Sequence, residues 1–242
     1  MSKHIPISIL TPSKGMGHHI PGLIKNIDAQ IGPYDEVILY FDGERPTNSL
    51  REFLGRYPYV RIIIGKINVG PAAGRNLLAK EAINPILRFQ DADDLLAPFS
   101  LDQARSILGA LENWQILVGG QLMYRNKVLH RVSLHNAEKR KQMLKALPEY
   151  NPLVVNLCYF NAACFKEVGG FDENIRFEED WDLWLRYHKL YGDDAFTFTD
   201  RLLGIYNTYR QDDPHKLHIQ PHIRSASREY IAKKHNVTPK DP

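Results

Sequence analysis

The chain has few cysteines: only Cys158 and Cys164 occur among its 242 residues. Their number and spacing match neither a disulfide scaffold nor a zinc site, so we expect two free thiols in a reducing compartment. Long apolar runs are missing too, because no uncharged stretch approaches the roughly 18 to 20 residues that span a bilayer. The chain also does not open on a charged-then-apolar leader. Together these absences predict a cytoplasmic protein.

A strong excess of one charge is also absent. The 31 Lys and Arg and the 28 Asp and Glu residues leave a formal net charge of +3. This excess is too small to predict nucleic acid as a partner. Hydrophobic residues make up 43% and charged residues 24% of the chain, the composition of a globular protein with a substantial core. We expect one domain.

Short β-rich runs alternate with amphipathic runs over the first 100 residues, which predicts a parallel, doubly wound sheet covered by helices. Ligands of such sheets bind outside the carboxyl ends of the strands. Those ends read Thr11-Pro12, Asp42-Gly43 and Asp91-Ala92-Asp93-Asp94. The expected strands are 5–13, 35–43, 60–65 and 86–90, and the expected helices are 19–31, 49–57 and 72–82.

The second half of the chain has a less regular pattern. We expect a helix over 99–113, a strand pair over 115–125 and 127–134, and an amphipathic helix over 178–191. Residues 135–145 are polar and rich in lysine, which is typical of an exposed helix or a mobile loop. The tail from Tyr209 is rich in His, Arg and Lys, and we expect its last five residues to be disordered.

Three carboxylates follow the buried strand 86–90: Asp91, Asp93 and Asp94. Their repulsion would be relieved by a hard cation such as Mg²⁺ or Mn²⁺, which also keeps coordination positions open for phosphate oxygens. The alternative is a solvated turn, with Asp94 or Ser100 capping the next helix. The position at the ligand-binding edge of the sheet favours the cation site.

Two residues near the other strand ends can also contact an anionic or polar ligand. Arg75 follows two glycines near a helix start and can pair with a diphosphate or with the acidic cluster. The alternative is a surface arginine after a turn. Asp42 can accept a hydrogen bond from a base or a ribose, and its alternative is a turn aspartate.

A further acidic group, Glu178, Glu179, Asp180 and Asp182, crowds the start of the helix over 178–191. A carboxylate there can serve as a general base for an acceptor hydroxyl. Trp181 and Trp184 can offer a flat face to a sugar ring. The alternative is helix capping by the acids and burial of both tryptophans in the core.

Six pieces of the sequence follow one another in this order: SILTPSKG, EVILYFDGE, NVGPAAGRN, FQDADDLLAP, VGGFDE and FEEDWDLWLR. In this order they resemble successive motifs of the family-2 glycosyltransferases with the GT-A fold. The resemblance runs from Ile7 to Tyr209. It implies an α/β GT-A fold, with a Rossmann-like, mostly parallel sheet flanked by helices and a small acceptor-side subregion. It also implies a nucleotide-sugar donor bound at the strand ends with Mn²⁺ or Mg²⁺, and inversion at the anomeric centre.

On this resemblance, residues 1–242 form one GT-A domain: a nucleotide-sugar-binding half (1–100), an acceptor-side half (101–210) and a basic C-terminal tail (211–242). The resemblance implies that Thr11 and Pro12 line the nucleotide pocket. Asp42 is expected to bond the base, and Arg75 to lie near the pyrophosphate and the acidic cluster.

The same resemblance divides the acids into roles. Asp91 is expected to face the ribose or sugar and to be the weaker metal ligand, and Asp93 to be the main one. Asp180 is expected to be the catalytic base, with Glu179 and Trp181 on the acceptor side. Asp94 is expected to be a turn or capping residue that matters less than Asp93.

The chain departs from the family pattern at several positions. Phe41 stands where the family often has an aspartate, Glu44 replaces a serine, and Lys14 adds a cation near the donor. The family's Tyr-Arg-x-His motif is replaced by Tyr-Arg-Gln-Asp from Tyr209, with His215 and His218 further on. His215 is a candidate contact to the metal or diphosphate, and its alternative is a surface histidine.

The resemblance implies an inverting, metal-dependent glycosyltransferase of surface-glycan or polysaccharide assembly. We expect a UDP-sugar donor, with GDP- and dTDP-sugars as alternatives, and a glycan or lipid-linked glycan acceptor. The alternatives in function are a non-catalytic nucleotide- or glycan-binding domain and a sugar-phosphate nucleotidyltransferase. Contact with the inner face of a membrane stays open through two basic groups, each of which is otherwise a solvated face. They are Lys139, Arg140, Lys141 and Lys145, and Arg224, Arg228, Lys233 and Lys234.

Overall fold

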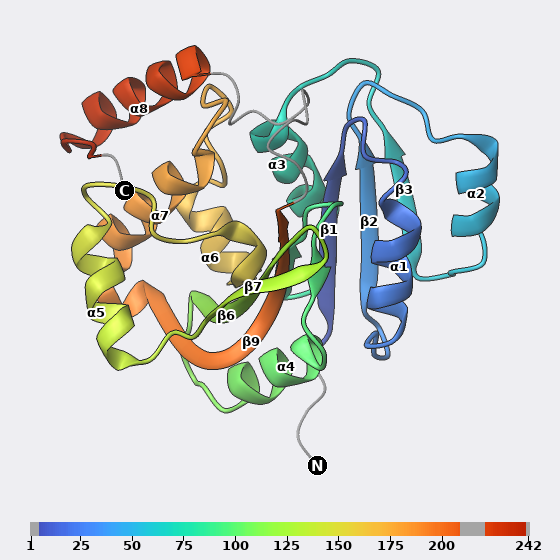
Figure 1. Cartoon of the computed structure of the whole chain (residues 1–242), viewed down its shortest axis with the longest axis horizontal. Coiled ribbons are helices and arrows are strands. Elements are labelled where there is room, and N and C mark those ends of the chain that lie inside the picture. Colours follow the sequence, from blue (N-terminus) through green and yellow to red (C-terminus); the bar gives the residue numbers. More distant parts are fainter. Residues whose placement is uncertain (1–4, 209–220, 241–242) are drawn as a thin grey trace.

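The computed structural model describes residues 5–208 and 221–240. Within them a nine-stranded sheet runs through the molecule, and helices cover both of its faces (Figure 1). The strand order is β3-β2-β1-β4-β8-β6-β9-β5, and β7 pairs with β6. The strands are β1 Ile7–Ser13, β2 Glu36–Phe41, β3 Val60–Ile64, β4 Ile86–Phe89, β5 Leu95–Leu96, β6 Ile116–Arg125, β7 Val128–Ser133, β8 Cys158–Asn161 and β9 Phe196–Thr208.

Strands β1 to β4 pair in parallel, β6 pairs in parallel with β9, and β5, β7 and β8 run antiparallel to their neighbours. The α/β class and the mostly parallel sheet are therefore confirmed. The helices are α1 Ile20–Asp28, α2 Asn48–Leu54, α3 Pro71–Glu81, α4 Ser100–Gly109, α5 Ala137–Ala146, α6 Ala162–Val168, α7 Glu179–Tyr191 and α8 Pro221–His235, with 3₁₀ turns at Val155–Leu157 and Gly192–Ala195.

Two apolar layers hold the sheet between its helices. Side chains alternate along each strand, so Ile9 and Leu39 join the layer of α1, α2 and α4, whereas Leu10 and Ile38 join the layer of α3, α6, α7 and α8. All of these strand residues are fully buried. Apolar residues on both faces of β1 and β2 thus explain why these strands lie inside the molecule.

The strand register places the residues of the predicted ligand-binding edge next to one another. Strand β1 lies between β2 and β4, with Pro12 opposite Tyr40 and Leu10 opposite Phe89. Because these three strands are parallel, the residues that follow them emerge at the same edge of the sheet, the upper edge in Figure 1. Asp42 and Asp91 therefore lie at one edge, as the sequence predicts.

The second half of the chain contains the expected strand pair, β6 and β7, and residues 135–145 contribute the helix α5. The sequence pattern did not predict α8, which lies beside α7 (Figure 1). The expected disorder of the last five residues is wrong for the part that the structure describes. The backbone N–H of Lys240 donates to the carbonyl of Glu149 at 2.7 Å, and its side chain pairs with the carboxylate of Glu149.

Candidate active site

Two adjoining cavities open at the carboxyl ends of the strands. The first, of about 380 Å³, is here called the strand-end cavity and is lined by residues after β1, β2 and β4. The second, of about 470 Å³, is called the helix-start cavity and lies at the beginning of α7. Four residues line both cavities: Pro71, Arg75, Asp91 and Asp93. The two cavities therefore meet at the acidic cluster.

The three aspartates after β4 have different surroundings. Asp91 pairs with Arg75, with 2.9 Å between Oδ1 and Nη2. Asp93 is partly exposed and lines both cavities. Asp94 is buried and accepts hydrogen bonds from the backbone N–H of Asn207, at 2.8 Å, and from the amide of Asn156.

The expectation that Asp94 is a solvated turn or capping residue needs correction. Its backbone does close the turn, but its side chain joins this turn to β9 and to the 3₁₀ turn 155–157. Burial and the nearby Asp93 and Asp91 raise the pKa of Asp94 well above its usual range. Neither Asp94 nor Ser100 caps α4, which begins after Phe99 without a side-chain cap.

Arg75 links the acidic cluster to α7. Its guanidinium pairs with Asp91 on one side and with Glu179 on the other. Burial acts to lower the pKa of Arg75, but the two carboxylates outweigh it and keep the group charged. Glu179, which we expected on the acceptor side, is thus a buried partner of Arg75 at the cavity wall.

Asp42 holds the loop before α3. Its two carboxylate oxygens accept the backbone N–H groups of Val69, at 2.7 Å, and of Gly70, at 2.9 Å. Gly70 has a φ of +89°, a conformation that favours glycine. Asp42 still lines the strand-end cavity, so its contact with a base stays a prediction.

The end of β1 contributes Pro12, and the loop after it contributes Lys14, to the strand-end cavity. Thr11 is fully buried behind them and does not line this cavity. Glu44, which departs from the family pattern, accepts the backbone N–H of Gly15 at 2.7 Å and so ties this loop to the end of β2. The departure thus has a structural reason.

Asp180 lies in the helix-start cavity, together with Asp91 and Asp93. Its Oδ1 accepts a hydrogen bond from the side chain of Asn151 at 2.8 Å and from the backbone N–H of Trp181 at 3.0 Å. Burial and the neighbouring Glu179 raise the pKa of Asp180 to about 8, although Arg75 opposes the shift. A carboxyl with such a pKa can accept a proton near neutral pH.

The expectation that Trp181 faces a sugar is wrong in this structure. Both Trp181 and Trp184 are fully buried in the core, and the indole N–H of Trp181 donates to the carbonyl of Leu147 at 2.7 Å. Helical spacing turns Asp180 toward the cavity and the next residue inward, because successive side chains of a helix point in different directions. Core packing, the alternative for these tryptophans, is the correct one.

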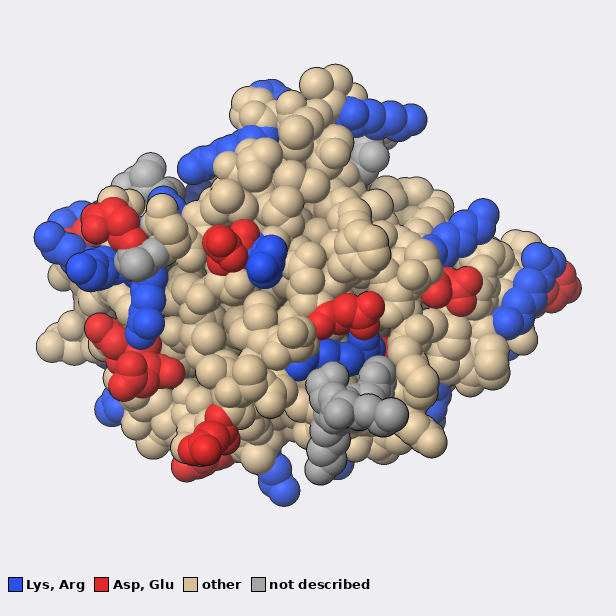
Figure 2. Space-filling model, turned by 90° about the horizontal axis from the view of Figure 1, so that it is seen from below, with Lys and Arg blue, Asp and Glu red and all other residues tan. Residues whose placement is uncertain are grey.

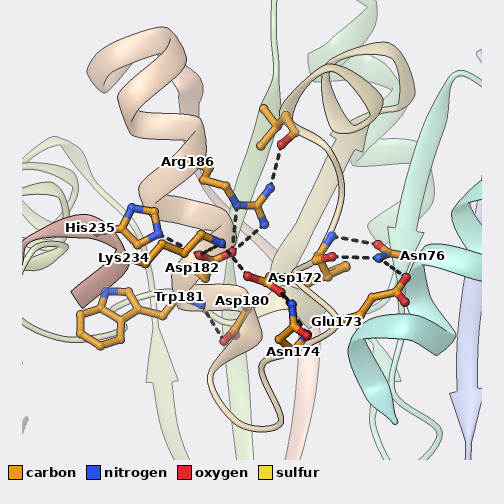
Figure 3. A network of polar contacts seen from close by, with 12 residues as sticks. Asn76, Asp172, Glu173, Asn174, Asp180, Trp181, Asp182, Arg186, Lys234 and His235 are labelled. Atoms are coloured by element: carbon orange, nitrogen blue, oxygen red, sulfur yellow. Dashed lines mark hydrogen bonds and ion pairs between the residues drawn. The ribbon is translucent and has the colours of Figure 1, made fainter. Parts of the chain in front are cut away.

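Asp182 and α8 form a polar network behind the cavity (Figure 3). Asp182 is fully buried and contacts Arg186, Lys234 and His235 at 2.8, 2.7 and 2.8 Å. Burial would raise its pKa, but the hydrogen bond from His235 and the charge of Arg186 outweigh this and lower it to about 2. The network fixes the C-terminal end of α8 on α7.

Sequence reasoning missed several residues at the two cavities. Arg176 lines the strand-end cavity and donates to the carbonyl of Val69 at 3.2 Å. Arg224 and Arg228 reach the helix-start cavity from α8, where both pair with Glu178. The surplus of basic residues in the tail was the signal available for α8, but it indicated a solvated face.

The acidic cluster fits a divalent metal of the Mg²⁺ or Mn²⁺ type. Among the described residues no group of three or more His, Cys, Asp or Glu side chains is arranged around one point. Asp93 and Asp91 nevertheless present hard oxygen atoms where the cavities meet. These cations are usually bound by one or two carboxylates plus water and substrate phosphates. His215 lies outside the described residues, as do Tyr209 and His218.

One of the two basic groups that could contact a membrane is partly engaged in ion pairs within the molecule. In the second basic group, Arg228 and Lys234 pair with acids of the α7 region and are not a solvated face. Acidic and basic side chains are interspersed among uncharged ones on the face seen in Figure 2. None of the helices in the described ranges is long and apolar enough to cross a bilayer.

Comparisons with known proteins agree with the fold and the motifs. The family model for glycosyl transferase family 2 matches residues 8–168. An uncharacterized glycosyltransferase of Rickettsia typhi is 24% identical over 192 residues, which are 75% of this chain and 58% of that protein. This chain therefore spans little more than half the length of that relative.

Solved structures share the architecture at low identity. S. aureus TarS 1–349 in complex with UDP-GlcNAc aligns over 95% of this chain and 66% of its own, with a TM-score of 0.69 and 15% identity. The mannosyltransferase PcManGT from Pyrobaculum calidifontis, in complex with GDP-Man and Mn²⁺, aligns over 100% of this chain and 67% of its own, with a TM-score of 0.68 and 14% identity. The GT-A fold predicted from the sequence is thereby confirmed.

Proposed function

The chain belongs to glycosyl transferase family 2, and on this premise we propose that it transfers a sugar from a nucleotide diphosphate sugar to an acceptor hydroxyl. The observation that carries the proposal is the junction of the two cavities at Arg75, Asp91 and Asp93. A donor in the strand-end cavity and an acceptor in the helix-start cavity would meet there. Asp180 lies on the acceptor side of this junction.

The donor's nucleotide would lie along Pro12 and Asp42, with its diphosphate toward Lys14 and Arg176. Asp93, assisted by Asp91, would hold a divalent metal, which when bound offsets the charge that develops on the departing diphosphate. Arg75 contributes by orienting Asp91 and Glu179 through its two ion pairs.

Asp180 would accept the proton of the acceptor hydroxyl as that oxygen attacks the anomeric carbon. The attack comes from the face opposite the leaving diphosphate, so one displacement inverts the anomeric centre. Asn151 holds the carboxylate of Asp180 at 2.8 Å and fixes its direction. The pKa of about 8 suits a base that works near neutral pH.

The structural neighbours bind UDP-GlcNAc or GDP-Man. We therefore propose a UDP-sugar as the first donor to test, followed by GDP- and dTDP-sugars. A glycan or a lipid-linked glycan is the proposed acceptor class, and surface-glycan assembly the proposed setting, with the protein in the cytoplasm.

The test is to incubate the protein with each donor and Mn²⁺ and to measure free nucleoside diphosphate. We expect slow release by the unaltered protein and by the control Asp200→Asn, which changes an exposed carboxylate of β9. Asp93→Asn should abolish the release. Donor binding without any release would instead identify a non-catalytic domain, and pyrophosphate-dependent nucleotide exchange would identify a nucleotidyltransferase.

A further inference from the structure

Three consecutive acids at the start of α7 contact three different partners. Glu178 pairs with Arg228 of α8, Glu179 pairs with Arg75 of α3, and Asp180 bonds Asn151 in the cavity. Like charges on adjacent residues repel one another, so each partner has to hold its own carboxylate. Each of the three side chains is thus held by a partner outside α7, and Asp180 is held in addition by the backbone N–H of Trp181.

Glu178 has an unusual backbone. It immediately precedes α7 and lies in the left-handed region, with a φ of +59° and a ψ of +32°. Few residues other than glycine adopt this region, because the Cβ atom crowds the backbone. In addition, no side-chain cap is present at this position. A directional contact of the side chain would help to hold this conformation.

That interaction comes from α8. Arg228 contacts the carboxylate of Glu178 with two nitrogens, Nε at 2.8 Å and Nη2 at 3.1 Å, and Arg224 Nε lies 3.4 Å from the same group. The side chains of Glu178 and Arg228 are 10% and 12% exposed, so solvent screens the pair little. Two-pronged contacts of this kind fix direction as well as distance.

The rest of α8 is anchored separately. Ile231 is fully buried in the core, and Lys234 and His235 bind Asp182 (Figure 3). Removing the Arg228 side chain therefore leaves α8 in place while taking away the two-pronged contact with Glu178, whose carboxylate keeps only the longer contact with Arg224.

We infer that Arg228 is a positioning residue: by holding Glu178 in the left-handed conformation, the C-terminal helix sets the direction in which Asp180 enters the helix-start cavity. The catalytic part of this inference rests on the proposed function. Without the contact, Glu178 relaxes to ordinary helical angles and adds a residue to α7. The backbone of Asp180, two residues further on, then turns away from Asn151.

The structural test needs no substrate. A crystal structure of Arg228→Gln should show Glu178 at a negative φ and the contact between Asp180 and Asn151 lost. An unchanged Glu178 backbone with Asp180 still on Asn151 would overturn the inference, whether or not the protein proves to be a transferase.

The kinetic test measures nucleoside diphosphate released from a UDP- or GDP-sugar with Mn²⁺. Arg228→Gln should lower kcat by about 10-fold or more, because small displacements of a reacting group cost this much, and should change the donor KM by less than about 2-fold. Arg228→Lys, which keeps the charge, should recover part of the loss. The matched control Arg201→Gln removes an exposed arginine of β9 and should have no effect.

Making the same change in a Glu178→Gly variant distinguishes a positioning role of Arg228 from direct contact with the substrate. Glycine adopts the left-handed region readily, so in Glu178→Gly the conformation no longer depends on Arg228. There, Arg228→Gln should cost less than about 2-fold in kcat. A loss of equal size in both backgrounds would mean that Arg228 acts on the substrate itself, and the positioning role would be rejected. Absence of release by the unaltered protein would refute the proposed function instead.

Discussion

Replacing Asp180 by Asn should move activity and stability in opposite directions. Burial and Glu179 raise the pKa of Asp180 to about 8, with Arg75 acting against them. In the unfolded chain the same carboxyl has an ordinary pKa of about 3.9. Between these values the folded state holds a proton that the unfolded state has released, so stability falls as pH rises through this window.

The size of the effect follows from the two pKa values. At about pH 7 the unfolded carboxyl is about three units above its pKa, and each unit is worth about 1.4 kcal/mol, which gives at most about 4 kcal/mol. Asn does not titrate, so Asp180→Asn should unfold with a higher free energy than the unaltered protein. The difference should grow from about pH 4 to about pH 8.

The catalytic effect has the opposite sign. Release of nucleoside diphosphate should fall by about 100-fold, the usual scale of general-base catalysis. In the unaltered protein, kcat/KM for the donor should rise with pH up to about 8 and then level off, since the base must be ionised to work. This rise should disappear from the residual activity of Asp180→Asn.

Urea unfolding followed by circular dichroism, at several pH values, measures the stability, and the same preparations serve for the kinetics. Asp200→Asn, on the exposed part of β9, is the control for removal of a negative charge. An Asn variant less stable than the unaltered protein at every pH would refute the raised pKa. Unchanged turnover with normal donor binding would exclude Asp180 as the base.

Three further predictions concern the acids and the arginine around the site. In urea unfolding, Asp94→Ala should lower the free energy of unfolding by about 2 to 4 kcal/mol, because it leaves two buried donors unpaired, and an unchanged stability would contradict this. Asp182→Asn should lower the free energy of unfolding by about 2 kcal/mol near pH 7, and this difference should shrink as pH falls from about 4 to about 2. Acid-unfolding curves of the two proteins that superimpose throughout would contradict this prediction. Arg75→Met should lower the free energy of unfolding by about 3 to 5 kcal/mol in thermal or urea unfolding, because Asp91 and Glu179 lose their cation. An unchanged free energy of unfolding would show that the two ion pairs of Arg75 do not stabilise the fold.

The parallel half of the fold could be predicted from the sequence because its signals are local. Apolar residues on both faces of β1 and β2 require helices on both sides, and parallel pairing then places Asp42 and Asp91 at one edge. The location of Arg75 near the acids was implied by the family resemblance, whereas the residues alone also allowed a surface arginine. What a local pattern cannot show is which oxygen atoms are already occupied, as those of Asp42 are by Val69 and Gly70.

The rest of the site depends on contacts between segments that lie far apart in the chain. In the sequence the basic residues of α8 have the pattern of a solvated face, but in the structure Arg228 and Lys234 pair with Glu178 and Asp182. The sequence around Asp94 predicts a turn residue, but in the structure its carboxylate accepts the backbone N–H of Asn207, more than 100 residues later in the chain. Trp181 is assigned to the core only once the carbonyl of Leu147 is known to accept its N–H. Each of these assignments needs tertiary structure.

The central claim, that the strand-end cavity binds a nucleotide sugar through a metal at Asp93, is tested most directly by thermal shift. A ligand present at about 100 times its Kd stabilises the folded state by about 2.7 kcal/mol, which for a chain of this size raises Tm by about 5 to 10 °C. We predict such a rise with a UDP- or GDP-sugar plus Mn²⁺, with Asp200→Asn behaving like the unaltered protein and Asp93→Asn showing no rise. The same rise in Asp93→Asn, or no rise with any donor, would contradict the claim.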